Sequence, residues 1–159
     1  MRSNPDIEDA LARYGDSVLR ACRATLSRSS DAEDIFQEVF IKYASHDEAF
    51  TDEEHRKAWL LRVAINASRD HLRKASEHNV PLEDANEISI STQAESVETR
   101  MTMKEALGLL NENQRTAVLL SVVEGYSAKE ISQIMDMPEN TEYSHIMRGK
   151  QRLREVLER

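Results

Sequence analysis

Apolar residues recur every three or four positions from Asp31 to Lys42, which is the spacing of an amphipathic helix. The apolar positions of this stretch share one predicted face: Ile35, Phe36, Val39 and Phe40. The opposite face is polar: Asp34, Gln37, Glu38 and Lys42. Acidic residues crowd the first turn, where they suit the positive end of the helix dipole. The pattern therefore predicts a helix that buries one face and exposes the other.

A second helical pattern runs from about Arg56 to Lys74. Its predicted buried positions follow the same spacing: Trp59 or Leu60, Val63, Ala67 and Leu72. The stretch holds six Lys and Arg residues against one acid, Asp70. Cations, a Trp and an Asn on one helix suit single-stranded nucleic acid, because cations neutralise phosphates and planar groups stack on bases. Trp59 alone is more often a core residue than a stacking platform, so both interpretations stay open.

The second half of the chain has the layout of a helix-turn-helix. An apolar helix ends at Gly125, a short amphipathic helix follows, and a basic helix comes after the turn at Met137-Pro138. Ser127 with Glu130 three residues later forms the sequence of a capping box, which starts the short helix. Its predicted core residues are Ile131, Ile134 and Met135.

The end of the chain is locally basic. Five cations stand against Glu155 and Glu158, a net charge of +3 in a protein whose net charge is −8: Arg148, Lys150, Arg152, Arg154 and Arg159. A positive stripe on an acidic protein is typical of polyanion binding. Cations near the end of a helix also complement its dipole without any ligand. Spacing alone does not decide between these two interpretations.

Composition adds a fold class and excludes a membrane protein. The 159 residues include only four Gly and three Pro, and aromatic residues make up 5%, which favours helices over sheet. We therefore predict an all-α fold. No apolar run approaches the roughly 18 residues that span a bilayer, and the first ten residues are acidic where a signal peptide is basic and then apolar. These features predict a cytoplasmic protein without membrane insertion.

Charge placement divides the chain into three parts. Residues 1–74 hold 12 cations and 14 acids, residues 75–98 hold six acids and no Lys or Arg, and residues 99–159 hold nine of each. The acidic segment lacks aromatic residues, so it buries too little surface to offset its ordering entropy. We predict two small helical domains, 1–76 and 99–159, joined by a flexible acidic linker, 77–98. A short helix near Ala94 to Val97 could belong to the second domain.

Little in the sequence points to catalysis. Cys22 is the only cysteine and stands at helical spacing from Val18 and Leu26, so we expect a buried, reduced thiol. The histidines do not form a metal-binding spacing with it: His46, His55, His71, His78 and His145. A Ser-His-Asp set and a Gly-rich phosphate loop are also absent from the sequence. We predict no catalytic residues, no metal site and no cofactor.

Taken together, three segments resemble a known family. DAEDIFQEVF, then AWLLRVAINASRDHLR, and after the acidic segment LNENQRTAVLLSVVEGYSAKEISQIMDMP, are similar to bacterial RNA polymerase sigma factors of the extracytoplasmic-function (ECF) group. The resemblance runs from about Asp6 to Leu157. It implies a transcription initiation factor whose region-2-like first domain and region-4-like second domain bind core RNA polymerase and direct promoter recognition and melting. It also implies an anti-sigma factor as partner.

The resemblance assigns expected roles to positions of this chain. Residues expected on the clamp helices of the polymerase's largest subunit are Asp34, Gln37 and Glu38. Those expected on minus-ten promoter DNA are Trp59, Arg62, Asn66, Arg69 and Arg73. Those expected on minus-thirty-five DNA are Thr141, Tyr143, Ser144, His145, Arg148, Lys150 and Arg152. The segment from His46 to His55, which carries five acids, matches the loop that frames a flipped base.

The predicted recognition helix departs from the family pattern. Glu142 stands where a buried Val is expected, Tyr143 replaces a Lys that contacts a base or phosphate, and His145 replaces an Arg. Gly149 weakens a helix by up to about 1 kcal/mol relative to Ala. Because an unpaired buried carboxylate is costly, we expect either that Glu142 faces solvent or that the helix is rotated. These departures and the acid-rich loop leave a second hypothesis, a degenerate sigma-like protein that binds polymerase or a regulator without directing initiation.

Overall fold

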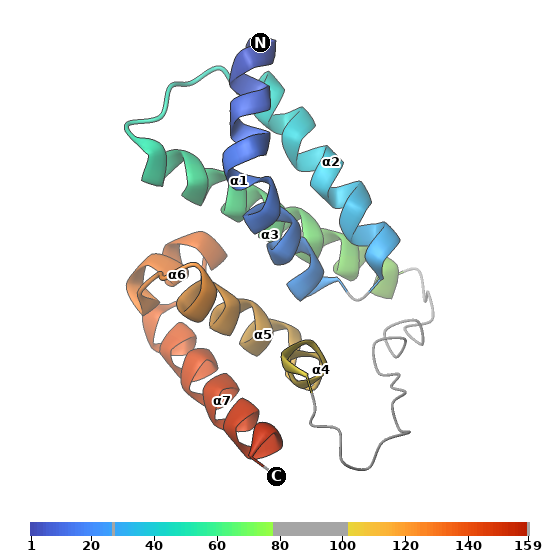
Figure 1. Cartoon of the computed structure of the whole chain (residues 1–159), viewed down its shortest axis with the longest axis vertical. Coiled ribbons are helices and arrows are strands. Elements are labelled where there is room, and N and C mark those ends of the chain that lie inside the picture. The colour runs from blue at the N-terminus through green and yellow to red at the C-terminus, as the bar shows by residue number, and fades with distance from the viewer. Residues whose placement is uncertain (27, 78–101, 159) are drawn as a thin grey trace. The chain divides into compact units, whose positions relative to one another are not determined.

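The structure is a computed structural model that describes residues 1–26, 28–77 and 102–158. Within these ranges every regular element is a helix, which confirms the all-α prediction. The chain forms two compact units, Met1–Val80 and Pro81–Arg159 (Figure 1). The predicted boundaries at 76/77 and 98/99 stay predictions, because most of the acidic linker, with the helix expected near Ala94, lies outside the described residues.

The first unit packs three helices against one another: α1 (Asn4–Thr25), α2 (Ser29–Ser45) and α3 (Glu53–Glu77). Helix α1 lies outside the predicted helices, although its start carries clear signals. The Ser3 hydroxyl accepts the backbone N–H of Asp6, and Pro5 lies in the first turn. The shared core takes residues from all three helices: Val18, Ala21, Cys22, Ile35, Val39, Leu60, Leu61, Ala64 and Ile65.

The buried face of α3 differs from the predicted one. Leu60 and Ala67 are buried as expected, but Trp59, Val63 and Leu72 are only half-buried, and Leu61, Ala64 and Ile65 are buried instead. The prediction was wrong because α3 packs against both α1 and α2, which buries a broader face than one stripe at 3.6-residue spacing. Cys22 is a buried free thiol, as predicted, and burial raises its pKa to about 11.

The second unit contains α4 (Met103–Gly108), α5 (Glu112–Val118), a π-helical turn (Leu119–Val123), α6 (Ala128–Met135) and α7 (Glu139–Leu157). The capping box of α6 is confirmed: the Glu130 N–H donates to the Ser127 hydroxyl, and the Glu130 carboxylate accepts the Ser127 N–H. Asp136, in the left-handed conformation at φ 56°, ends α6 before Pro138. Thus α6 and α7 form the predicted helix-turn-helix.

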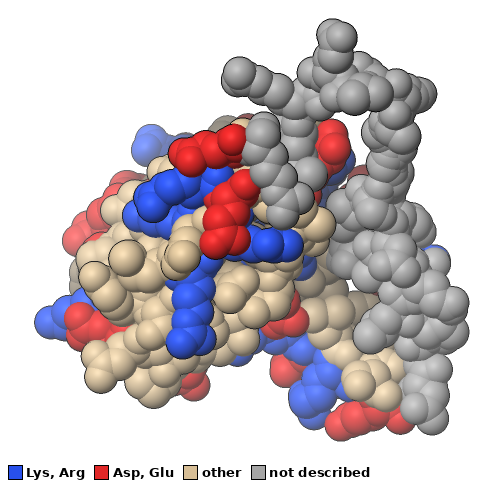
Figure 2. Space-filling view, turned by 90° about the horizontal axis from the view of Figure 1, so that it is seen from below, with Lys and Arg blue, Asp and Glu red and all other residues tan. Residues whose placement is uncertain are grey.

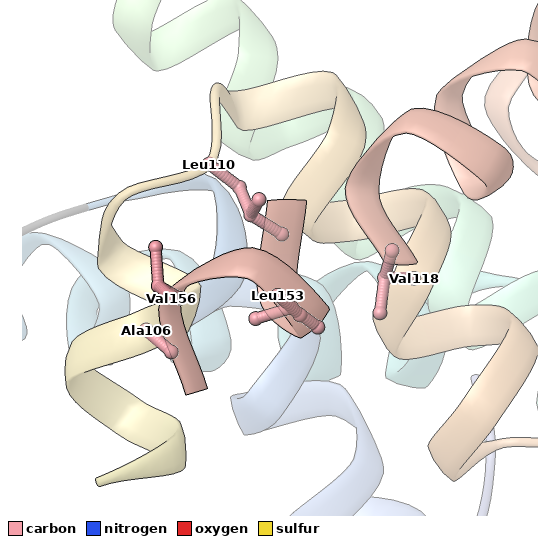
Figure 3. Close-up of a cluster of buried hydrophobic side chains, with 5 residues drawn as sticks. All are labelled: Ala106, Leu110, Val118, Leu153 and Val156. Atoms are coloured by element: carbon pink, nitrogen blue, oxygen red, sulfur yellow. The ribbon is translucent and has the colours of Figure 1, made fainter. Parts of the chain in front are cut away.

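A small apolar cluster holds α7 against the preceding helices (Figure 3). Its members come from α4, α5 and α7 and the α4–α5 connection: Ala106, Leu110, Val118, Leu153 and Val156. The cluster therefore holds the C-terminal part of α7 against α4 and α5.

Gly149 lies buried where α7 crosses α5. A Cβ atom at this position would lie 2.5 Å from Val118 Cγ2 and 3.3 Å from the Gln114 carbonyl oxygen. The absence of a side chain lets the two helices approach closely, and this close packing offsets the poor helix propensity of Gly. Gly149 is therefore a packing requirement of this helix pair rather than a simple weakness of the recognition helix.

Glu142 has no exposed surface, so the expectation that it faces solvent is wrong. The rotated alternative is wrong as well, because rotation would take Glu142 out of the core, and instead Glu142 begins the buried stripe of α7: Glu142, Ile146, Gly149, Leu153 and Val156. The carboxyl group occupies the core-facing position that the family gives to Val. Its place in the first turn of α7 sets it at the positive end of the helix dipole, which favours an acidic side chain.

Candidate polymerase and nucleic-acid interfaces

The outer face of α2 is a compact polar surface with one apolar residue. Asp34, Gln37 and Glu38 are exposed, and the Glu38 carboxylate pairs with Lys42 Nζ at 3.1 Å. Ile41 lies on the same face and is 68% exposed, an unusual position for a large apolar side chain. Sequence reasoning missed Ile41, although its helical spacing from Gln37 and Glu38 signals the shared face. We call Asp34, Gln37, Glu38 and Ile41 the α2 face.

The five residues expected on minus-ten DNA fall on one side of α3. They succeed one another at intervals of three and four residues: Trp59, Arg62, Asn66, Arg69 and Arg73. Arg62, Asn66 and Arg73 are exposed, whereas Trp59 and Arg69 are half-buried. Arg73 also contacts Asp70 at 3.4 Å and Glu77 at 3.6 Å, both in exposed ion pairs that DNA phosphate can replace. We call these five residues the α3 stripe.

Trp59, at one end of the α3 stripe, belongs to an aromatic cluster that includes side chains of the loop joining α2 to α3, residues 46–52. Its ring centroid lies 4.5 Å from that of His46, 5.7 Å from Phe50 and 6.0 Å from Tyr43. The His55 ring meets Phe50 edge-on at 5.1 Å. Trp59 is thus neither a full core residue nor an isolated platform, since its half-buried ring packs against two side chains of the loop.

Three acids of the His46–His55 segment have structural partners. The Asp47 carboxylate pairs with the N-terminal amino group of Met1 at 2.7 Å. The Asp52 carboxylate accepts the backbone N–H of His55 at 2.8 Å and so caps α3. Glu53 accepts hydrogen bonds from Tyr14 and from Arg56. The segment is therefore less repulsive toward a nucleic-acid strand than its five acids suggested, because part of this negative charge is compensated within the unit.

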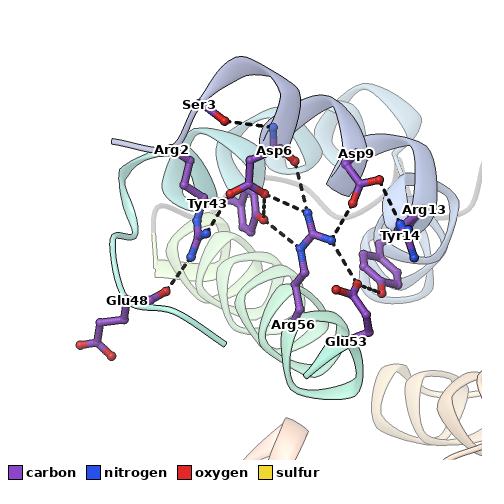
Figure 4. A network of polar contacts seen from close by, with 10 residues as sticks. All are labelled: Arg2, Ser3, Asp6, Asp9, Arg13, Tyr14, Tyr43, Glu48, Glu53 and Arg56. Carbon is purple, nitrogen blue, oxygen red and sulfur yellow. Dashed lines mark hydrogen bonds and ion pairs between the residues drawn. The ribbon is translucent and has the colours of Figure 1, made fainter. Parts of the chain in front are cut away.

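Arg56 is the centre of a polar network that joins the three helices of the first unit (Figure 4). Its Nη2 lies 2.9 Å from Asp6 Oδ1, its Nη1 lies 2.8 Å from Asp9 Oδ2 and 3.1 Å from Glu53 Oε1, and its Nε donates to the Tyr43 hydroxyl at 2.9 Å. The side chain is only 9% exposed. Arg56 is therefore not one of the surface cations of the basic helix, as the sequence argument assumed, but a structural residue.

The same network perturbs the acids around Arg56. The hydrogen bond from Tyr43, reinforced by Arg2 and Arg56, lowers the pKa of Asp6 below its ordinary value. The hydrogen bond from Arg56 lowers the pKa of Asp9, and the hydrogen bond from Tyr14 lowers that of Glu53. Folding therefore favours the charged form of each of these three carboxyl groups.

The outer face of α7 carries most of the residues expected on minus-thirty-five DNA. Tyr143, Arg148, Lys150 and Arg152 are exposed, and Thr141, Ser144 and His145 are half-buried. Directly opposite the buried stripe, helical spacing places Asn140, Ser144, Met147 and Gln151. Met147 is 50% exposed, and sequence reasoning missed both it and Gln151. The residues of this outermost face, which would enter a DNA groove, are thus small, polar or flexible, and cations lie on either side of them.

Cations do not form a continuous field on the face of the protein seen in Figure 2. On the face seen in Figure 2, Lys and Arg side chains are intermixed with Asp and Glu. Among the described residues, the structure contains no helix long and apolar enough to cross a membrane. The described part of the chain also has no group of three or more His, Cys, Asp or Glu residues placed to hold a metal ion.

Comparison with known proteins gives a consistent result for both units. Residues 10–78 match the model of Sigma-70 region 2, and residues 100–153 match that of Sigma-70, region 4. The ECF RNA polymerase sigma factor SigM of Mycobacterium tuberculosis is 31% identical over 146 residues, which cover 91% of this chain and 74% of that protein. The ECF RNA polymerase sigma-E factor of Haemophilus influenzae is 29% identical, covering 89% and 82% respectively.

A solved structure supports the fold. The sigma factor RpoE of Bartonella quintana, crystallised in complex with the anti-sigma factor NepR, has a TM-score of 0.74 and 23% sequence identity, covering 96% of this chain and 97% of that one. The region 2 match lies within the first unit and the region 4 match within the second. The chain belongs to the ECF group of RNA polymerase sigma factors, which are transcription initiation factors and not enzymes.

Proposed function

We propose that the α2 face binds core RNA polymerase, that the α3 stripe holds one strand of the minus-ten DNA, and that α7 reads minus-thirty-five DNA. The observation that carries this assignment is the α3 stripe, where cations, an amide and an aromatic ring share one side of a helix. In this account the protein acts in the cytoplasm, because the polymerase and the chromosomal DNA that it binds are located there.

The composition of the α3 stripe suits a single strand. Arg62, Arg69 and Arg73 can neutralise successive phosphates, and the Asn66 amide can donate to and accept from a base edge. Trp59 and the aromatic cluster offer apolar surface to an unstacked base at the end of the stripe. These contacts offset the few kcal/mol that unpairing and unstacking a base cost. Melting in this account needs no nucleotide hydrolysis.

The outer face of α7 suits the major groove of duplex DNA. Arg148 can reach guanine through two donors, and Met147 can pack on a thymine methyl group. Lys150 and Arg152 lie toward the flank, where cations contact phosphate without reading sequence. The replacement of family cations by Tyr143 and His145 alters the expected sequence preference rather than the mode of docking, because α7 keeps its buried stripe.

We also propose a protein partner that restrains the chain, of the class to which anti-sigma factors belong. The crystallised RpoE of Bartonella quintana is bound to such a protein, and its fold is shared by this chain. No observation on the described residues favours the hypothesis of a sigma-like protein that does not direct initiation. The acid-rich loop and the altered recognition helix, which suggested it, are compatible with a working factor.

The Asn66→Ala variant tests the assignment of α3. Holoenzyme carrying it should form open complexes on a duplex promoter roughly tenfold less well than the original chain, since a bidentate base contact is worth about 1–3 kcal/mol. On a promoter with a pre-melted bubble the loss should be smaller, because the unpairing cost has already been met. Permanganate reactivity of unpaired thymines measures the opening.

The matched control is Ser76→Ala, which removes an exposed polar side chain near the end of the same helix, beyond the α3 stripe. It should open both templates as the original chain does. An equal loss on duplex and bubble templates for Asn66→Ala would contradict a role in melting and would place the defect in assembly with polymerase.

A further inference from the structure

Arg2 makes a set of contacts that spans α1, the end of α2 and the loop of residues 46–52. Its backbone N–H donates to the Ala44 carbonyl at 2.9 Å, its Nη1 pairs with Asp6 Oδ2 at 3.0 Å, and its Nη2 donates to the Glu48 carbonyl at 2.7 Å. The side chain is only 12% exposed. Figure 4 shows the guanidinium between Asp6, Tyr43 and the backbone at Glu48.

The guanidinium also covers the aromatic cluster. Its carbon lies 4.5 Å from the Tyr43 ring centroid and 4.9 Å from that of Phe50, and these two rings are parallel within 2°. A planar guanidinium stacks on aromatic faces while its donors bind in the plane, which a lysine ammonium cannot do. Arg2 therefore holds the Glu48 carbonyl and the Phe50 ring in one fixed relation to Tyr43.

Phe50, which Arg2 holds in place, is in turn in contact with Trp59. The Phe50 ring lies 5.7 Å from the Trp59 ring and 5.4 Å from that of His46, and His46 in turn lies 4.5 Å from Trp59. The loop between α2 and α3 has no regular secondary structure of its own, so its backbone position depends on contacts of this kind. A change at Arg2 would alter the apolar surface at the end of the α3 stripe.

We propose that Arg2 is a positioning residue for base capture: it fixes the 46–52 loop and Phe50 so that the aromatic cluster accepts an unstacked base of the minus-ten strand. This inference rests on the proposed function of α3. Arg2 does not act as a phosphate-binding cation, because its side chain is largely buried and its donors are directed at Asp6 and Glu48. Its effect is on recognition of the base rather than on general attraction of DNA.

The test uses holoenzyme and a fluorescein-labelled fork DNA that carries the unpaired minus-ten strand of a promoter mapped by transcription. Each fork is prepared with the intact strand and with an abasic site at each unpaired position in turn. The ratio of the two dissociation constants measures how strongly a base is captured. We expect the original chain to prefer the intact strand at one position or more. In Arg2→Ala the ratio of the two dissociation constants at that position should fall about tenfold, because base–aromatic stacking is the contact affected. Affinity for the abasic fork should stay the same.

Two further variants separate positioning from charge and from folding. Arg2→Lys keeps the positive charge but not the planar fork, so it should lose most of the preference that Arg2→Ala loses. Arg23→Ala, which removes an exposed cation from the other end of α1, should keep the full preference. Acrylamide quenching of Trp59 should increase in both Arg2 variants at unchanged helix content by circular dichroism, which reports a loosened loop in a folded unit.

The outcomes are distinguishable. Full base preference in both Arg2 variants would overturn this inference and leave the proposed function of α3 intact. A preference that is restored by Arg2→Lys would also overturn it, because charge alone would then suffice. An original chain that binds intact and abasic forks equally at every position would overturn the proposed role of α3, and the role of Arg2 with it.

Discussion

Replacing Arg56 with Ala should lower the free energy of unfolding of the first unit by about 1.5–3 kcal/mol, because it removes the hydrogen bonds that a largely buried guanidinium makes to charged groups. The guanidinium joins Asp6 and Asp9 of α1 to Tyr43 of α2 and to Glu53 of its own helix. Urea denaturation followed by the fluorescence of Trp59, the only Trp of the chain and a residue of this unit, measures the loss.

The control is Arg13→Ala, which breaks an ion pair between Arg13 and Asp9 whose side chains are 57% and 44% exposed. Solvent screens such an exposed pair and leaves it little net effect on stability, so this variant should unfold close to the original midpoint. A loss at Arg56 no larger than that at Arg13 would show that the network does not join the helices energetically.

The same network predicts acid sensitivity. Folding lowers the pKa values of Asp6, Asp9 and Glu53, so their contribution to stability is present above the unfolded values of about 4 and is lost as the pH falls through the folded values. The first unit should therefore lose stability below about pH 4.5, and Arg56→Ala should show a shallower decline over that range. Parallel pH profiles of the two proteins would contradict this.

The second large effect concerns assembly with polymerase. Replacing Asp34, Gln37 and Glu38 together with Ala should weaken binding to core RNA polymerase by about 2–5 kcal/mol, because charged groups across an interface lose their partners. The fold should persist, since all three side chains are exposed and lie opposite Ile35 and Val39. Fluorescence anisotropy of labelled chain titrated with core polymerase measures the affinity.

A matched variant removes the same number of acids from another exposed surface. Glu8 and Asp16 are exposed on α1, away from the α2 face, so replacing both with Ala should leave the affinity for core polymerase within about twofold, as for surface substitutions outside an interface. Unchanged binding of the triple variant would remove the α2 face from the proposed interface. Equal weakening by both variants would point to net charge as the cause.

Local signals in the sequence predicted much of the fold. Ser127 and Glu130 mark the start of α6, and the apolar period of Ile35, Val39 and Phe40 sets the buried side of α2. These features depend on neighbours within one or two turns of helix, so the chain itself contains the information. The α2 face and the α3 stripe follow from the same periodicity, although their binding roles remain proposals.

Other features depend on partners distant in the chain. Arg56 looks like a surface cation until α1 brings Asp6 and Asp9 to it from about 50 positions away. Gly149 looks like a weak point of a helix until α5 places Val118 against it. The burial of Glu142 contradicts its polarity, because the packing of α7 decides which face is inside. The contacts of Arg2 with Glu48 and Phe50 likewise could not be predicted, because they form only when the loop of residues 46–52 folds against the start of the chain.

Transcription by purified core polymerase tests the central claim most directly. Core polymerase with this chain should produce discrete run-off transcripts from genomic DNA of the organism that encodes it, and the DNA upstream of their mapped starts should share two short sequence blocks, since each unit reads one block. Core polymerase alone should produce none of these starts. A chain that binds core polymerase and yet adds no start to those of core alone would contradict the account.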